Sequence, residues 1–136
     1  MRPENRLPIF AEEVLWRRLT TPDWIKVTNG TSRVSSAAFK GHDKDLELST
    51  HIARLTTLDW VFGTPPDSLG VAEILAQYPQ ELGLRVEHDP EPNDYSHAVI
   101  HLSPVYGNRK KHAKKMASHA LLRPKPLAKL AAGDAD

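Results

Sequence analysis

Two short segments in which apolar and polar residues alternate, residues 84–88 and 97–102, constrain the fold more than any other feature of the chain. The residues between them are rich in turn formers such as Pro90, Pro92 and Asn93, so the two segments are expected to form an antiparallel hairpin. A shift of the pairing by one residue would mix apolar and polar side chains on both faces. We therefore predict that residue 87 lies opposite 99 and residue 89 opposite 97, which gathers one apolar face: Leu84, Val86, His88, Ala98, Ile100 and Leu102.

The apolar face of such a hairpin needs a cover, and the best candidate is a helix near the C-terminus that runs to about Leu122. Its apolar residues recur at helical spacing, namely Ala113, Met116, Ala117, Ala120 and Leu121. The chain has 136 residues, a length typical of one domain. We therefore predict an α+β fold. A single compact domain over residues 1–122 would have an antiparallel sheet packed against a basic amphipathic C-terminal helix, followed by a tail over residues 123–136.

Weaker patterns suggest the remaining elements. Residues 14–19 have the length of a strand or a short helix, and residues 24–27 are expected to form a hairpin with 33–39 across the turn pair Asn29-Gly30. A helix is expected to begin after Thr57, residues 71–75 to have extended or mixed structure, and a short helix to run from Pro79 to Gly83. Large apolar side chains at periodic positions are expected to be largely buried: Trp16, Phe39, Trp60, Leu84, Val86, Ile100 and Met116.

Charge is distributed unevenly along the chain. Residues 107–130 carry eight lysines and arginines without one acid, whereas residues 1–106 carry ten basic and fifteen acidic residues. Such a basic segment favours a non-catalytic binding or accessory module that contacts nucleic acid or an acidic partner protein. The alternative is contact with the acidic part of the same chain. The expected contact residues are Arg109, Lys110, Lys111, Lys114, Lys115, Arg123 and Lys125.

A small enzyme, such as a hydrolase, is the second hypothesis. The predicted register makes Asp89 and His97 cross-strand neighbours, and a carboxylate that holds an imidazole fixes its tautomer, as general acid–base catalysis requires. Ser35 or Ser36 would supply the nucleophile. The chain has no Gly-x-Ser-x-Gly elbow and no phosphate-binding Gly-x-x-x-x-Gly-Lys segment. The simpler interpretation is a turn at Asp89-Pro90 with a histidine that stabilises the hairpin.

Composition sets further bounds. Zero cysteines exclude disulfides and thiolate metal sites. Seven histidines are present, but His97 and His101 would lie about 13 Å apart along one strand, so we predict no metal site and no cofactor. No apolar run reaches the roughly 18 residues that a membrane span needs, and the first residues lack the apolar core of a signal peptide. A cytoplasmic location without a membrane partner is expected.

Several segments, read in order, form a recognisable pattern: LWRRL, RVSSAAFK, LELSTHIA, GVAEILA, ELGLRVEHDP and SHAVIHL, followed by the basic helix. Over residues 14–122 the chain resembles a family of small uncharacterised bacterial proteins, mainly actinobacterial, that share an Arg-x-Ser-Ser-x-x-Phe segment and a His-Ala-x-Ile or His-Ala-x-Val strand. The resemblance implies special roles for Arg33, Ser35, Ser36, Phe39, Ser49, Asp89, Pro90, His97 and Ala98.

A second resemblance concerns the order of an arginine and a serine pair. Arg17 or Arg18, followed by Ser35-Ser36, resembles the order found in NAD-consuming ADP-ribosyltransferase-like folds, which would imply an enzyme that acts on NAD. The pattern lacks a clear glutamate in its third position, because Glu87 and Glu91 flank a predicted turn and Glu73 falls in a segment that also fits helical spacing. The alternative is that the arginine pairs with the acidic body and that the serines hydrogen-bond at a strand end.

Overall fold

The computed structural model describes residues 6–63 and 68–125, which contain eight strands and three α-helices and form one α+β domain, as predicted. The strands are β1 (Val14–Leu19), β2 (Ile25–Thr28), β3 (Thr31–Val34), β4 (Glu47–Ile52), β5 (Gly70–Leu75), β6 (Val86–His88), β7 (His97–His101) and β8 (Leu121–Pro124). The helices are α1 (Leu58–Gly63), α2 (Gln77–Glu81) and α3 (Tyr106–His119), with short 3-10 helices at Pro22–Trp24, Ser36–Phe39 and Ala53–Leu55.

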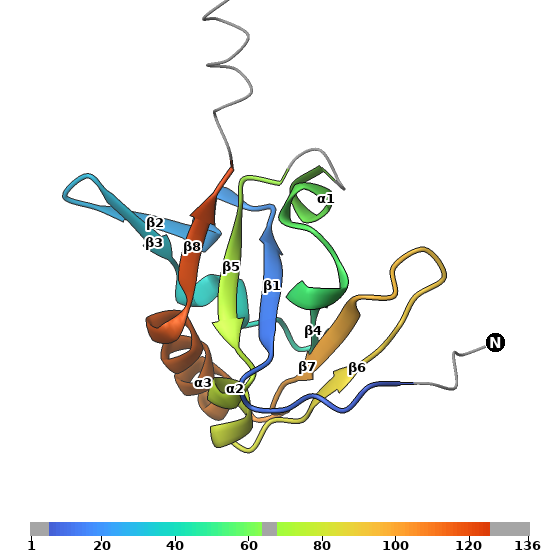
Figure 1. Ribbon diagram of the computed structural model, residues 1–136. Coiled ribbons are helices and arrows are strands. Elements are labelled where there is room, and N and C mark those ends of the chain that lie inside the picture. Colours follow the sequence, from blue (N-terminus) through green and yellow to red (C-terminus); the bar gives the residue numbers. More distant parts are fainter. Residues whose placement is uncertain (1–5, 64–67, 126–136) are drawn as a thin grey trace, which may run out of the picture.

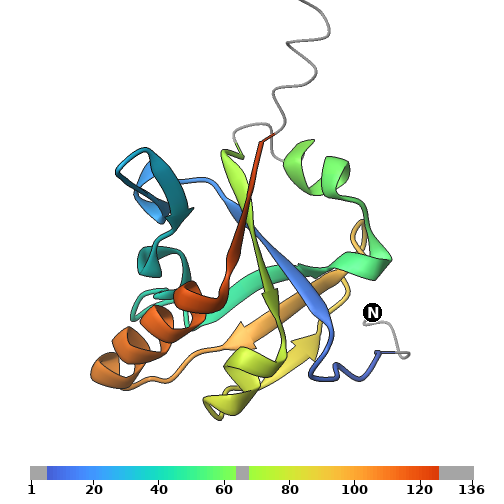
Figure 2. The same cartoon turned by 60° about the vertical axis from the view of Figure 1, so that its left-hand side comes forward.

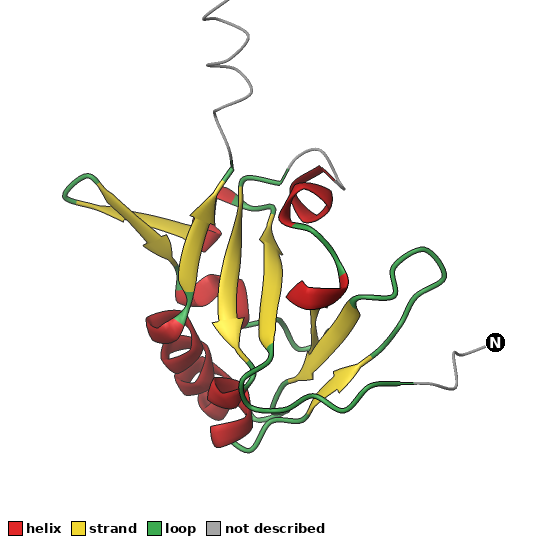
Figure 3. Ribbon diagram, viewed as in Figure 1, coloured by secondary structure: helices red, strands yellow, loops and turns green. Residues whose placement is uncertain are grey.

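Six strands form one antiparallel sheet in the order β6-β7-β4-β1-β5-β8 (Figure 1). The strands β2 and β3 form a separate hairpin that projects from the side of the sheet where β8 lies (Figure 1). The turn of that hairpin places Asn29 and Gly30 at φ values of 53° and 79°, the left-handed region that an Asn-Gly pair tolerates. Residues 36–39, predicted to extend the second strand, form a 3-10 helix instead (Figure 3). The Ser35 hydroxyl accepts from the Ala37 N–H at its start.

The β6–β7 hairpin has the predicted register. Val86 lies opposite Ile100 and Glu87 opposite Val99, and the Asp89 N–H donates to the His97 carbonyl at 2.8 Å. The strand β6 is shorter than predicted, because it begins at Val86 and not at residue 84. The predicted extended segment 71–75 is confirmed as part of β5, and the predicted short helix is present as α2, beginning two residues before Pro79.

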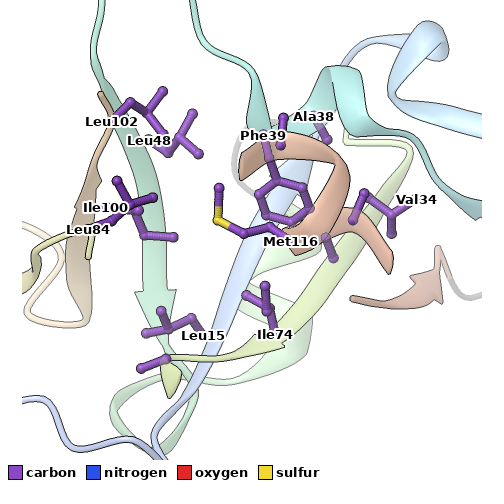
Figure 4. Close-up of a cluster of buried hydrophobic side chains, with 14 of the residues drawn as sticks. Leu15, Val34, Ala38, Phe39, Leu48, Ile74, Leu84, Ile100, Leu102 and Met116 are labelled. Atoms are coloured by element: carbon purple, nitrogen blue, oxygen red, sulfur yellow. The ribbon is translucent and has the colours of Figure 1, made fainter. Parts of the chain in front are cut away.

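The core lies between one face of the sheet and a layer made of α3, α2 and the 3-10 helix Ser36–Phe39 (Figure 2). Figure 4 shows Met116 of α3 at the centre of this cluster, between Phe39 and the side chains of the sheet. Phe39, Leu84, Ile100 and Met116 are buried as predicted, and Trp16 and Val86 are partly buried. The prediction was wrong for Trp60, which is 37% exposed because α1 packs on the opposite face of the sheet, where Val61 and Phe62 contact Val71.

The C-terminal boundary of the domain lies further along the chain than predicted. The helix α3 ends at His119, and the following residues form β8, which pairs with β5 so that Val71 lies opposite Arg123. Arg123 and Pro124 therefore belong to the sheet and not to a tail. The rest of the predicted tail, from residue 126 onward, lies outside the described residues. None of the helices in the described ranges is both long enough and apolar enough to span a membrane.

Ile100 is the residue whose truncation tests the sheet most directly. Its side chain is fully buried on β7, the second strand of the sheet, and contributes to the main cluster. Ile100→Ala is expected to lower the free energy of unfolding by about 2–5 kcal/mol, because it removes buried methyl groups and leaves a cavity. Chemical denaturation measures this change. A loss below about 0.5 kcal/mol would contradict the placement of Ile100 in the core.

Candidate functional site

The face of the sheet that α3 does not cover carries polar side chains from neighbouring strands. Ser49 and His51 of β4 and His97 of β7 share this face with Arg18 of β1, since side chains two residues apart point the same way along a strand. Together with α1 and the loop after β6 they enclose a cavity of about 450 Å³, which we call the histidine pocket. It is lined by Arg18, Ser49, His51, Trp60, Glu91, Pro92, Asn93, Asp94 and His97.

His97 is 6% exposed and makes two hydrogen bonds that define its tautomer. Its Nδ1 lies 2.9 Å from the backbone oxygen of Asp89, which can only accept, so Nδ1 carries the proton. Its Nε2 is then an acceptor, 3.2 Å from the hydroxyl oxygen of Ser49. Two carboxylates flank Nδ1, with Asp89 Oδ2 at 3.5 Å and Glu91 Oε2 at 3.9 Å.

His51 lies directly opposite His97 across the β4–β7 pair, with 6.1 Å between the ring centroids. Its Nδ1 lies 2.9 Å from Asp94 Oδ2, and its Nε2 lies 3.4 Å from Nη2 of Arg18. Burial of the ring lowers the pKa of His51 to about 4, and the attraction of Asp94 offsets this only in part. At neutral pH the His51 ring is therefore uncharged: it donates to Asp94 and accepts from Arg18.

This lowered pKa predicts a pH dependence of stability. The pKa of His51 is about 4 in the folded chain and about 6.5 in the unfolded chain, so the unfolded chain binds the proton more tightly. The contribution to stability is complete above about pH 6.5 and is lost as the pH falls toward 4. Between pH 7 and 5 the wild type should lose about 2 kcal/mol more than His51→Gln, as measured by urea denaturation. Equal losses in the two proteins would contradict this assignment.

Arg18 and Trp60 form the side of the histidine pocket on which α1 lies. The Arg18 guanidinium donates from Nε to the Val61 carbonyl at 2.9 Å and lies 5.8 Å from the centre of the Trp60 ring. The edge of the same ring contacts His51, with the two ring centroids 5.7 Å apart. The pocket thus combines a fixed cation, a partly exposed indole and two buried imidazoles.

The structure brings together only part of the predicted catalytic set. Asp89 and His97 are adjacent, but Ser35 and Ser36 lie beside α3, in a different hollow from His97. Arg17 points toward the core side of the sheet, where it donates to the carbonyls of Ala38 at 2.6 Å and Ser49 at 3.0 Å, and desolvation lowers its pKa to about 10. The serine hydroxyl that lies within hydrogen-bond distance of His97 is that of Ser49.

A second candidate site is the outer face of α3. Lys110, Lys111, Lys114 and Lys115 are exposed, and we call them the lysine face. Lys114 lies with Lys26 and Arg33 around a hollow of about 270 Å³ that also includes Ser35, Ser36 and Ser118. Lys26 and Arg33 are direct partners across the β2–β3 hairpin, so three elements of the fold contribute cations to one basic surface.

The other predicted contact residues lie elsewhere. Arg109 is 1% exposed, donates to Asp43 and to the carbonyl of Ser103, and is therefore not part of the basic surface. Arg123 of β8 donates to Glu73 Oε1 at 2.8 Å on the sheet. Lys125 follows β8 and is exposed.

Sequence reasoning overlooked several residues of these two sites. Ser49 was singled out only by the family resemblance, and Arg18 only as the alternative to Arg17 in the second resemblance. His51, Asp94 and Trp60 were not assigned to a site. Alternation along residues 47–52 puts Ser49 and His51 on one face, but it does not reveal that β7 lies beside them. The pairing of Lys26 with Arg33 was predictable from the sequence, because a two-residue Asn29-Gly30 turn places positions 26 and 33 opposite each other.

Comparison with known proteins does not assign either site. Neither the family models nor the curated proteins nor the solved structures include a match to this chain. Across residues 6–63 and 68–125, no group of three or more histidine, aspartate and glutamate side chains is arranged to hold a metal ion.

Proposed function

We propose that this protein is a binding module that contacts nucleic acid through the basic surface formed by the lysine face, Lys26 and Arg33. The observation that carries the proposal is that Lys26, Arg33 and Lys114, from three elements, surround one hollow. Three further exposed lysines lie on the same helix as Lys114, namely Lys110, Lys111 and Lys115. Each lysine or arginine that neutralises a phosphate releases counterions and adds a salt-dependent increment of affinity.

The chemistry of this surface favours nucleic acid over an acidic protein. Stable protein interfaces usually have an apolar or aromatic centre and are depleted in lysine. The hollow beside Lys114 is lined by cations and serines, with Ala117 as its one apolar residue. A phosphate backbone needs only cations and hydroxyl donors, which this surface supplies.

The positions of the lysines also support a role beyond solubility. Lys110 and Lys114 are four residues apart, as are Lys111 and Lys115, and like charges at this spacing destabilise a helix by about 0.2–0.5 kcal/mol per pair. The first turn of α3 contains no acidic residue, so Lys110 lies near the positive end of the helix dipole without compensation. A charge arrangement that costs stability is expected where an anionic partner offsets the repulsion.

Fluorescence anisotropy tests the proposal with the full chain and labelled duplex DNA, single-stranded DNA and duplex RNA. Because phosphate contacts do not read sequence, unrelated sequences should bind alike. Duplex affinity should fall about 10²–10³-fold between about 50 and 200 mM salt if four to six phosphates are contacted. Absence of binding to all three polymers at low salt, with tight binding of poly-glutamate, would replace this proposal by an acidic protein partner.

A further inference from the structure

We infer that the histidine pocket is a hydrolytic site in which Ser49 is the nucleophile and His97 its general base, acting on small carboxylic esters. This inference is independent of the basic surface, because none of the cations of that surface lines the pocket. It rests on the arrangement of Ser49, His97 and Asp89.

The order of hydrogen bonds is the one that proton transfer requires. The carbonyl of Asp89 fixes the proton of His97 on Nδ1, which leaves the lone pair of Nε2 directed at the Ser49 hydroxyl at 3.2 Å. A base held by a third group within hydrogen-bond reach of a hydroxyl is the general signature of an activated nucleophile. The Asp89 and Glu91 carboxylates near Nδ1 would stabilise the imidazolium formed when His97 takes the proton.

The two reacting groups are held by rigid surroundings but differ in exposure. Thr50, between Ser49 and His51, donates to the Ala98 carbonyl at 3.0 Å, and Arg17 holds the Ser49 carbonyl at 3.0 Å. The first contact fixes β4 against β7, and the second fixes β4 against β1. Ser49 itself is exposed and His97 is buried, so a substrate in the cavity can reach the hydroxyl while the base is shielded from bulk water.

The reaction needs only water as a second reactant. The Ser49 oxygen bonds to the ester carbonyl carbon as its proton moves to His97 Nε2, and the ester C–O bond then breaks as His97 protonates the departing alcohol. Water next attacks the acyl-serine carbon and gives a proton to His97. The carboxylic acid leaves, and His97 returns the proton to the Ser49 oxygen. The cavity of about 450 Å³ beside Ser49 has room for a small ester.

A fluorophosphonate probe tests the nucleophile without knowledge of the natural substrate. The serine oxygen bonds to phosphorus, fluoride leaves, and the proton passes to the base. Intact-mass measurement followed by peptide mapping should show one adduct, at Ser49. The adduct should be absent from Ser49→Ala and unchanged in Ser32→Ala, a matched control on the exposed β2–β3 hairpin.

The rate of labelling separates catalysis from a structural role of the Ser49–His97 hydrogen bond. His97→Gln should slow adduct formation about 10²–10⁴-fold in protein that still melts cooperatively. If His97→Gln fails to fold, the position of the adduct in the wild type still tests the nucleophile. No adduct on folded wild type, an adduct at another residue, or equal labelling of Ser49→Ala would overturn the inference.

Discussion

Reversing the charge of the lysine face, by changing Lys110, Lys111, Lys114 and Lys115 to Glu, is expected to lower affinity for duplex DNA at least about 100-fold at low salt. Four phosphate contacts are lost, and each contributes through counterion release. The added acids also repel the remaining phosphates. The four side chains are exposed and outside the core clusters, so the fold should persist. Anisotropy with labelled duplex measures the affinity, and circular dichroism checks the fold.

A control with two arginines elsewhere on the molecule tests whether the lysine face is the surface that binds DNA. Arg54 and Arg85 are exposed arginines outside the basic surface, each within salt-bridge distance of a carboxylate. Their replacement by Glu changes the net charge by as much as replacing Lys111 and Lys114. If both pairs weakened binding equally, overall charge and not the lysine face would be responsible.

Truncation of Arg109 is expected to produce the largest loss of stability among the charged residues. Its side chain is the largest that is fully buried, donates to Asp43 and to the carbonyls of Ser103 and Pro104, and lies 5.4 Å from the Tyr106 ring centre. Arg109→Ala leaves a cavity and removes donors from two carbonyls, so the free energy of unfolding should fall by about 3–5 kcal/mol.

We expect a structural role for the buried Arg109 and no structural role for its exposed neighbour Lys110. Urea denaturation of Arg109→Ala and Lys110→Ala should show a large loss for the first and a change within about 0.5 kcal/mol for the second. Similar small changes in both would mean that Arg109 is not anchored in the core.

The misassignment of Arg109 shows where sequence patterns mislead. Position 109 lies four residues before Ala113 and seven before Met116, so the helical period already places it on the buried stripe. We expected a charged side chain to face solvent, because buried arginine is rare unless it is paired. Its partner Asp43 comes from a distant loop, and no local pattern reveals that contact.

Local sequence patterns were sufficient to predict which side chains share one face of a strand. They were not sufficient to predict which strands lie beside each other in the sheet. The β6–β7 register follows from alternation and a short loop, and it was predicted correctly with Asp89 beside His97. The placement of β4 beside β7 joins segments about fifty residues apart, and that pairing creates the Ser49–His97 contact. The serine within hydrogen-bond distance of His97 is therefore Ser49, and not Ser35 or Ser36 as the enzyme hypothesis expected.

The exposure of Trp60 has a related cause. A short helix with Thr57 at its start was predicted correctly, and the Thr57 hydroxyl accepts from the Trp60 N–H at 3.2 Å. Its packing partner was not predictable, because α1 covers the second face of the sheet through Val61 and Phe62. Trp60 consequently lines the histidine pocket instead of the core.

The salt dependence of duplex binding tests whether the lysine face contacts nucleic acid. It is measured for wild type, for the double variant Lys111→Gln with Lys114→Gln, and for the double variant Arg54→Gln with Arg85→Gln. The two double variants carry the same net charge. Our account predicts that the plot of log affinity against log salt becomes flatter by about 2 for the lysine variant, about 0.9 for each lost contact, and is unchanged for the arginine variant. Equal slopes for all three proteins would contradict nucleic-acid binding by the lysine face.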